Sequence, residues 1–300
     1  MIKISMRQLE IFCAIVGAGS TTAAAAHIGL SQSAVSAALN ELESVLATKL
    51  FDRAGKRLLL NDAGKALLPQ ARRALDDATQ IEAHFAQRSD DTPATLTIGA
   101  SSTIGNYVLP ALLAAFHEKA VNTRVNIRIG NSTTIAGMVA NFEVDMGIIE
   151  GPCHETSLDA TPWLEDELVI VGGHGHPLTR QKQTSIADLQ NADWLLREPG
   201  SGTREEVACA LLPHLHAFRS TVAIGSSEGI KRSVAAGLGI SCLSNWVIDD
   251  LLKTGSLHVL KTPLPPLKRR FHLLCHRDKF ITKNLAALLE HLHAAQLQKT

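Results

Sequence analysis

The chain has few aromatic residues, few cysteines and no excess of either charge. Aromatic side chains make up 4% of its 300 residues, so few large rings are available to line a binding site. Lysine plus arginine and aspartate plus glutamate both number 29. The zero net charge argues against a broadly basic surface for nucleic acid, but it leaves room for a small basic footprint. The five cysteines are scattered and odd in number, which predicts reduced thiols rather than a disulfide framework.

Long apolar runs are also missing. No stretch approaches 18 consecutive apolar residues, and no charged-then-apolar leader is visible at the start of the sequence. We therefore expect a cytoplasmic protein without a membrane span or a signal peptide. A hydrophobic fraction of 45% over this length is enough for substantial cores, and the length suggests about two domains.

The most informative stretch lies near the N-terminus, where two short helical patterns are separated by Gly29-Leu30-Ser31. Gly29 permits a tight turn, and Ser31 is placed to cap the second helix by accepting a backbone N–H bond. This pattern favours a helix-turn-helix whose second helix enters the DNA major groove, over an ordinary Ala-rich helical hairpin. The outward row of that helix is polar and contains no acid: Gln32, Ser33, Ser36 and Asn40, following the cap Ser31.

The segment that follows predicts a wing and a long helix. Residues 50–60 hold two strand-like runs around a turn at Ala54-Gly55, a β-hairpin whose basic tip is suited to DNA phosphates. Asn61 is placed to cap a helix running from about Lys65 to Ala86. A long helix with a narrow apolar seam usually packs on another helix, so we expect a dimerisation helix rather than the surface helix of a monomer. The basic tip is formed by Arg53, Lys56 and Arg57, and the seam by Leu68, Ala71, Leu75, Ala78 and Phe85.

Residues 6–86 resemble the winged helix-turn-helix and linker helix of LysR-type transcriptional regulators. The resemblance is carried by Met6–Phe12, by Ser31–Ser36, and by Leu42-Glu43 ahead of Leu50–Arg53. It implies promoter DNA and a small-molecule effector as partners, and assembly into a homodimer or homotetramer. Ala37 stands where many members carry a basic residue. Base contacts must then come from the polar row, without an arginine fork to guanine from this helix.

From about residue 94 the pattern changes to strands alternating with helices, which predicts largely parallel β-sheet covered on both faces. The two αβ sets resemble the two lobes of a periplasmic-binding-protein fold, with a hinge near Pro162-Trp163 and the Pro-rich segment 263–266. The fold class is therefore α/β, with three parts. Residues 1–62 form the winged helix-turn-helix, 63–92 the linker helix, and 93–300 the effector domain, with lobe I at 93–163 and 267–300 and lobe II at 164–266.

Three loops of the predicted lobes are suited to an anion. Each follows a strand and precedes a helix, so it offers hydroxyl groups and free backbone N–H groups at a positive helix terminus. Any one of them alone is more often a plain helix cap, but three on one face favour a compact anionic ligand. The candidate residues are Ser101, Ser102 and Thr103 in the first loop, Asn131, Ser132 and Thr133 in the second, and Arg197, Gly202, Thr203 and Arg204 in the third.

Several segments of the effector domain also resemble the YeiE- and CysL-like branch of the family. They include Ser101–Tyr107, Ile149–Cys153 and Gly200–Arg204. Through Ile149–Cys153 the resemblance adds Glu150 to the candidate effector residues. It implies a role in sulfur metabolism and sulfite, or a related small oxyanion, as the effector. We expect no other cofactor.

The competing interpretation is a cytosolic anion-binding or serine-hydrolase-like α/β protein with an incidental helical N-terminal domain. Gly225–Gly229 spells the G-x-S-x-G nucleophile elbow, but no oxyanion-loop motif is recognisable upstream and a catalytic serine leaves residues 1–86 unexplained. His174-x-His176, His214-x-His216 and Cys153-His154 lack further ligands at a structural-zinc spacing. We therefore expect a transcriptional regulator that is neither an enzyme nor a metalloprotein.

Overall fold

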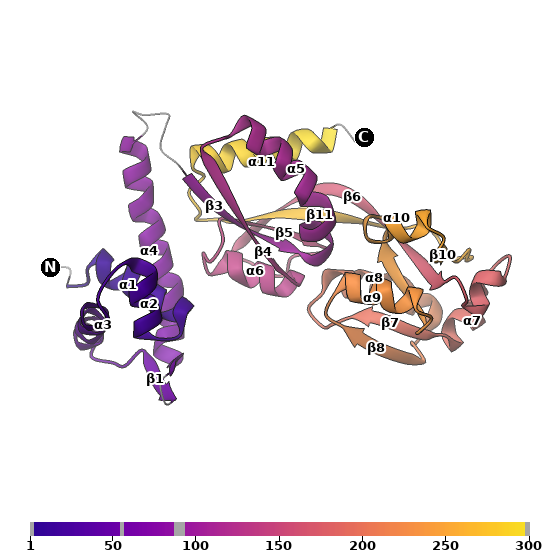
Figure 1. The fold of residues 1–300 in the computed structure, drawn as a ribbon, viewed down its shortest axis with the longest axis horizontal. Helices are drawn as coiled ribbons and strands as arrows, with labels where there is room; N and C mark the ends of the chain where they lie inside the picture. Colours follow the sequence, from indigo (N-terminus) through magenta and orange to yellow (C-terminus); the bar gives the residue numbers. More distant parts are fainter. Residues whose placement is uncertain (1–2, 55–56, 87–93, 298–300) are drawn as a thin grey trace. The chain divides into compact units, whose positions relative to one another are not determined.

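The structure is a computed structural model that describes residues 3–54, 57–86 and 94–297 (Figure 1). The chain divides into two compact units. The first contains residues 1–91 with the short segments 140–143 and 278–282, and the second contains the rest.

The first unit is a winged helix-turn-helix followed by a long helix. Ser31 caps α3 as predicted, because its Oγ accepts the N–H of Ala34 at 3.2 Å, and Gly29 ends α2 with a φ of 68°. The predicted wing is confirmed as an antiparallel hairpin of β1 and β2, although Gly55 and Lys56 lie outside the described residues. The elements are α1 (Met6–Ala18), α2 (Thr21–Ile28), α3 (Gln32–Leu46), β1 (Phe51–Ala54), β2 (Arg57–Leu60) and α4 (Asp62–Ala86).

The long helix α4 begins at Asp62, earlier than expected, and Asn61 caps it by accepting the N–H of Gly64 at 2.9 Å. The seam expected to face a partner helix instead packs in part within its own unit. Ala71 is buried in the winged-helix core, and Leu68 and Leu75 pack against that core. The expectation that this seam packs on a partner helix is therefore wrong for Leu68, Ala71 and Leu75, which pack within the unit. The side chain of Phe85 lies outside the described residues.

No single helix in the described part of the chain is long and apolar enough to cross a membrane. The pair α1 and α2 passes that test only when taken together, and it is bent by 117° at the break between them.

The second unit is built on a nine-stranded sheet with the order β4-β3-β5-β11-β6-β9-β7-β8, and β10 pairs with β6. Strands β3, β4 and β5 are mutually parallel, as are β7, β8 and β9, whereas β6 and β11 pair antiparallel with their neighbours. The sheet is therefore mixed, with a parallel part in each lobe. The first lobe contains β3 (Ala94–Ser101), the π-helix η1 (Ile104–Val108), α5 (Leu109–Lys119), β4 (Thr123–Gly130), α6 (Ser132–Ala140), β5 (Met146–Glu150) and α11 (Lys283–Leu297).

The second lobe has apolar clusters on both faces of its sheet, as the alternation of strands and helices predicts. It contains η2 (Pro177–Arg180), α7 (Ile186–Asn191), β7 (Asp193–Arg197), α8 (Gly202–Leu215), β8 (Ser220–Ile224), α9 (Ser227–Ala235), β9 (Ile240–Ser244), α10 (Asn245–Lys253) and β10 (Leu257–Val259). One of its clusters includes Cys242, where burial raises the pKa of the thiol to about 12. All five cysteines are free in the structure.

Two long strands connect the lobes. Strand β6 (Leu158–Gly173) and strand β11 (Leu267–His276) run together from one lobe into the other (Figure 1). The predicted hinge residues Pro162 and Trp163 both lie inside β6. The ladder is irregular opposite this point, between Arg270 and His272. Such a bulge bends a strand locally without breaking it.

Candidate DNA interface and effector site

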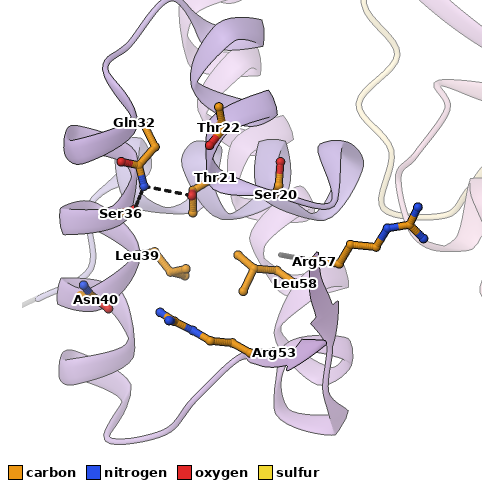
Figure 2. A pocket seen from close by; sticks show the side chains of 10 residues that line it. All are labelled: Ser20, Thr21, Thr22, Gln32, Ser36, Leu39, Asn40, Arg53, Arg57 and Leu58. Carbon is orange, nitrogen blue, oxygen red and sulfur yellow. Dashed lines mark hydrogen bonds between the residues drawn. The ribbon is translucent and has the colours of Figure 1, made fainter. Parts of the chain in front are cut away.

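The groove of the first unit has a volume of ≈ 220 Å³ and brings together three elements. Figure 2 shows the side chains of α3 on one wall, those of the wing on the other, and the start of α2 between them. Among the described residues that line it, two are arginines and none is acidic. It is lined by Ser20, Thr21, Thr22, Gln32, Ser36, Leu39, Asn40, Arg53, Arg57 and Leu58.

Gln32 is held in this groove by two hydrogen bonds. Its Nε2 donates to Ser36 Oγ at 2.8 Å and to Thr21 Oγ1 at 3.2 Å, as Figure 2 shows. These two bonds occupy both N–H hydrogens of the exposed amide, so its Oε1 is the atom left to accept a hydrogen bond from a base edge in the major groove.

The structure brings five of the eight predicted DNA-binding residues to the groove: Gln32, Ser36, Asn40, Arg53 and Arg57. Ser31 and Ser33 lie at the start of α3, where their hydroxyl groups are 3.0 Å apart, and Lys56 is outside the described residues. The groove also includes Ser20, Thr21 and Thr22 at the start of α2, which were not among the predicted DNA-binding residues. Ser20 Oγ accepts the N–H of Ala23 at 3.2 Å and caps this helix. The Ser-Thr-Thr run ahead of four alanines is a recognisable start signal for this helix, but it does not indicate that these residues lie beside α3 and the wing.

In the second unit, the first predicted effector loop is almost completely buried. Ser101 ends β3 and is 0% exposed, and Thr103, two residues on, is 1% exposed. Ser101 Oγ and Thr103 Oγ1 have no hydrogen-bond partner among the described residues. Buried hydroxyl groups without partners are costly, so they mark a place where a ligand or water is expected. The Thr103 N–H donates to Glu150 Oε1 at 3.0 Å, so a carboxylate already faces this loop.

Arg269 is the main residue that sequence reasoning missed. Its Nε donates to Asp166 Oδ2 at 2.7 Å and its Nη1 to Thr203 Oγ1 at 2.8 Å. Its Nη2 is buried and has no partner among the described residues. The sequence contained one signal: in β11, Arg269 lies on the same face of the strand as the buried residues Phe271 and Leu273. A charge at a core position usually has a specific partner.

The second and third predicted loops bond mainly to each other. Ser132 Oγ donates to the carbonyl of Glu150 at 3.1 Å and accepts the N–H of Gly202 at 3.2 Å. The N–H of Thr133 donates to the carbonyl of Gly200 at 3.0 Å. A Cβ on Gly202 would lie 1.9 Å from the Glu150 carbonyl oxygen, so only glycine permits this approach. Asn131 Oδ1 caps α6 by accepting the N–H of Thr134 at 2.9 Å.

Both arginines predicted for the third effector loop, Arg197 and Arg204, already donate hydrogen bonds within the protein. Arg197 is 3% exposed, donates through Nε and Nη2 to the two carboxylate oxygens of Glu198 at 2.8 Å, and donates through Nη1 to Ser227 Oγ at 2.9 Å. Burial alone would raise the pKa of Glu198, but the Arg197 guanidinium holds it below its ordinary value. Arg204 Nη1 donates to the Arg197 carbonyl at 2.6 Å. Among the described residues of this region, Arg269 is thus the buried guanidinium with an unpartnered donor.

The remaining motifs have structural explanations. Ser227, the would-be nucleophile, is 1% exposed and accepts its bond from Arg197, while Ser226 caps α9. His174 Nδ1 lies 3.0 Å from His258 Nε2, and His154 Nε2 lies 2.9 Å from Glu205 Oε1. Across the described residues, no group of three or more His, Cys, Asp or Glu side chains could hold a metal ion.

Comparison with known proteins decides the family. Residues 6–65 match the bacterial regulatory helix-turn-helix protein, lysR family, and residues 89–296 match the LysR substrate binding domain. The chain belongs to the LysR family. It is 45% identical over 296 residues to the uncharacterized HTH-type transcriptional regulator YeiE of Escherichia coli K12, covering 99% of each chain. The HTH-type transcriptional regulator CysL of Bacillus subtilis is 32% identical, over 97% of this chain and 98% of CysL.

The solved structures agree on the fold of this LysR-family chain. A full-length OxyR variant from Pseudomonas aeruginosa has a TM-score of 0.80 at 22% identity, and the match covers 97% of this chain and 95% of OxyR. The chain is therefore a DNA-binding LysR-family transcriptional regulator with an effector-binding domain, not an enzyme. The serine-hydrolase alternative is excluded.

Proposed function

We propose that this regulator senses a small oxyanion at a site formed by Ser101, Thr103 and Arg269. The observation that carries the proposal is the set of three buried polar atoms without partners among the described residues: two hydroxyl groups and one guanidinium nitrogen. A guanidinium and hydroxyl groups are suitable donors for an oxyanion, and charge-assisted hydrogen bonds are the strong ones.

A chain of contacts supports the view that these groups serve one site. Arg269 bonds Thr203, the neighbouring Gly202 bonds Ser132, and Ser132 bonds the Glu150 carbonyl. Glu150 in turn accepts the N–H of Thr103. All the groups are nearly inaccessible to solvent, which favours a compact ligand over one with a large organic part. Sulfite is the first candidate, sulfate or thiosulfate the next, and a small carboxylate the last.

Titration calorimetry of the full chain with these four kinds of anion tests the proposal. We expect one of them to bind, and Thr103→Val to weaken that binding because one hydrogen bond to a charged group is lost, worth about 1.5–3 kcal/mol. Thr179→Val is the matched control, since its Oγ1 bonds the carbonyl of His176 in the second lobe. No heat with any anion would refute the site and leave the DNA-binding function untouched.

We also propose that the protein is at least a dimer. Anion binding would then change the relative position of the two α3 helices that contact the DNA bases. This is a coupling between two distinct sites. A gel shift with DNA from upstream of the protein's own gene, with and without the anion, measures it. Unchanged DNA affinity and unchanged complex mobility at saturating anion would contradict the coupling.

A further inference from the structure

Tyr107 of the first lobe packs into the second lobe. It is the only tyrosine of the chain and lies in η1, four residues after Thr103. Its ring packs against the core cluster of the second lobe that contains Ile230, Val234 and Val247. A π-helical turn is rare and is often found at functional sites. The segment that begins at the proposed anion site therefore ends in a contact across the two lobes.

The hydroxyl of Tyr107 donates to Glu228 Oε2 in the first turn of α9. That carboxylate is fixed by two cations, with Lys231 Nζ at 2.7 Å and Arg232 Nε at 2.8 Å. Lys231 is 1% exposed, and its Nζ lies 3.1 Å from both carboxylate oxygens of Asp250 and 5.2 Å from the centre of the Tyr107 ring. The phenol thus meets a preformed cluster of charges rather than a mobile surface acid.

The protonation states of Tyr107 and Glu228 favour a strong hydrogen bond between them. Burial, and then the hydrogen bond to Glu228, raise the pKa of Tyr107 above its ordinary value. Burial alone would raise the pKa of Glu228, but bonds from Lys231, Tyr107 and Arg232 lower it to about 2. At neutral pH the phenol is therefore a donor and the carboxylate an ionised acceptor, which gives a charge-assisted hydrogen bond.

We propose that Tyr107 is a positioning residue for effector binding, whose hydroxyl fastens η1 to α9 and thereby holds Ser101 and Thr103 in place. The inference rests on the proposed anion site. Without this bond, the domain would populate arrangements in which the hydroxyl groups and Arg269 no longer converge. The apparent affinity for the anion falls by the fraction of molecules that leave the competent arrangement.

The first experiment tests the contact itself, without any anion. Because the chain has one tyrosine, the ultraviolet absorbance of phenolate follows Tyr107 alone. We expect this group to titrate well above a free tyrosine in the wild type, and closer to a free tyrosine in Glu228→Gln. Lys231, Arg232 and Asp250 also face the pair, so the comparison is made at high salt as well. Titration of the wild type at the ordinary pKa would overturn the inference.

The second experiment tests the positioning role. Tyr107→Phe keeps the ring over Lys231 and removes only the hydroxyl. We expect sulfite to bind this variant about ten-fold more weakly, as for one lost hydrogen bond to a charged group. In a Glu228→Ala background the same substitution should have no further effect, because its partner is already gone. Thr179→Val, which removes a hydroxyl of the second lobe, should retain wild-type affinity.

Hydrogen exchange separates failure of this inference from failure of the anion site. Loss of the bond should speed exchange of the η1 amides in Tyr107→Phe by about ten-fold. Wild-type affinity or unchanged η1 exchange in this variant would overturn the positioning role. If the wild type binds none of the anions, the anion site fails, and the exchange result alone decides whether Tyr107 fastens the lobes.

Discussion

Arg269 and Asp166 form an ion pair across β11 and β6, with 2.7 Å between Nε and Oδ2 and with both side chains almost completely buried. Asp166 also accepts a hydrogen bond from Ser244 Oγ at 2.8 Å, and Arg269 donates to Thr203. Segments distant in sequence therefore meet at one ion pair, on the two strands that connect the lobes.

Arg269→Met leaves the Asp166 carboxylate buried without its cation. We expect the effector domain to lose about 3–5 kcal/mol of unfolding free energy, as when one partner of a buried pair is removed. The neighbouring Arg270→Met is the matched control, because Arg270 pairs with Glu165 at 2.8 Å on the surface and should cost at most about 1 kcal/mol. Urea unfolding followed by tryptophan fluorescence measures both. Equal effects would mean that the buried pair is not what stabilises this junction.

Helix α3 gives a prediction about the base preference of DNA binding. Gln32→Ala removes the amide that Ser36 and Thr21 orient, so we expect relaxed base preference at one position of each half-site. The loss of discrimination should be about 1–3 kcal/mol. Competition binding against an operator and its single-base variants measures it, with Gln70→Ala on α4 as the control. Wild-type discrimination in Gln32→Ala would remove this residue from base readout.

The wing gives a prediction about the salt dependence of DNA binding. Arg53 lines the groove beside α3 (Figure 2), and its position in the basic tip of the wing predicts that it contacts DNA phosphates. Arg53→Ala should weaken binding to all sequences similarly and reduce the slope of log K against log salt by about 0.9, the value for one phosphate. Arg219→Ala, an exposed arginine of the effector domain, should leave the slope unchanged. A variant that loses only operator affinity would instead indicate that Arg53 reads bases.

The turn and the helix cap of the helix-turn-helix were predictable from the sequence, because each depends on residues that are adjacent in the chain. Ser31 caps the helix that it precedes, and Gly29 supplies a left-handed turn. The site in the effector domain was only partly predictable. The end of a predicted strand singled out Ser101 and Thr103 but did not predict that they are buried. Arg269 is 66 positions from Thr203 and 103 from Asp166, and no local pattern specifies those pairings. Position at a strand end also could not show that Ser132 and Gly202 bond across the lobes instead of remaining open.

Substitutions at two positions of helix α4 should distinguish the stability of the first unit from the dimerisation of the protein. Leu75 packs against the winged-helix core, so Leu75→Asp should destabilise the first unit by placing a charge in that core. Ile81 is 63% exposed and lies further along the helix, so it is available to a second copy of the chain. Ile81→Asp should leave thermal stability nearly unchanged and shift sedimentation toward the monomer. Thr79→Asp is the control for added charge on this helix. A wild-type protein that sediments as a monomer at micromolar concentration would contradict the proposed dimer.

Glu150 gives a prediction about the charge of the effector. Its carboxylate is 1% exposed and accepts the N–H of Thr103, beside the two hydroxyl groups proposed to bind the anion. Glu150→Gln keeps an acceptor oxygen for that N–H but removes the negative charge. Like charges repel by a few kcal/mol over about 5 Å at a protein-like dielectric of about 20. We therefore expect sulfite and sulfate to bind Glu150→Gln at least about ten-fold more tightly, measured by calorimetry, with Glu165→Gln as a surface control. Weaker binding of sulfite in Glu150→Gln would point to a protonated anion that donates to the carboxylate, and unchanged binding of both would show that the anion lies elsewhere.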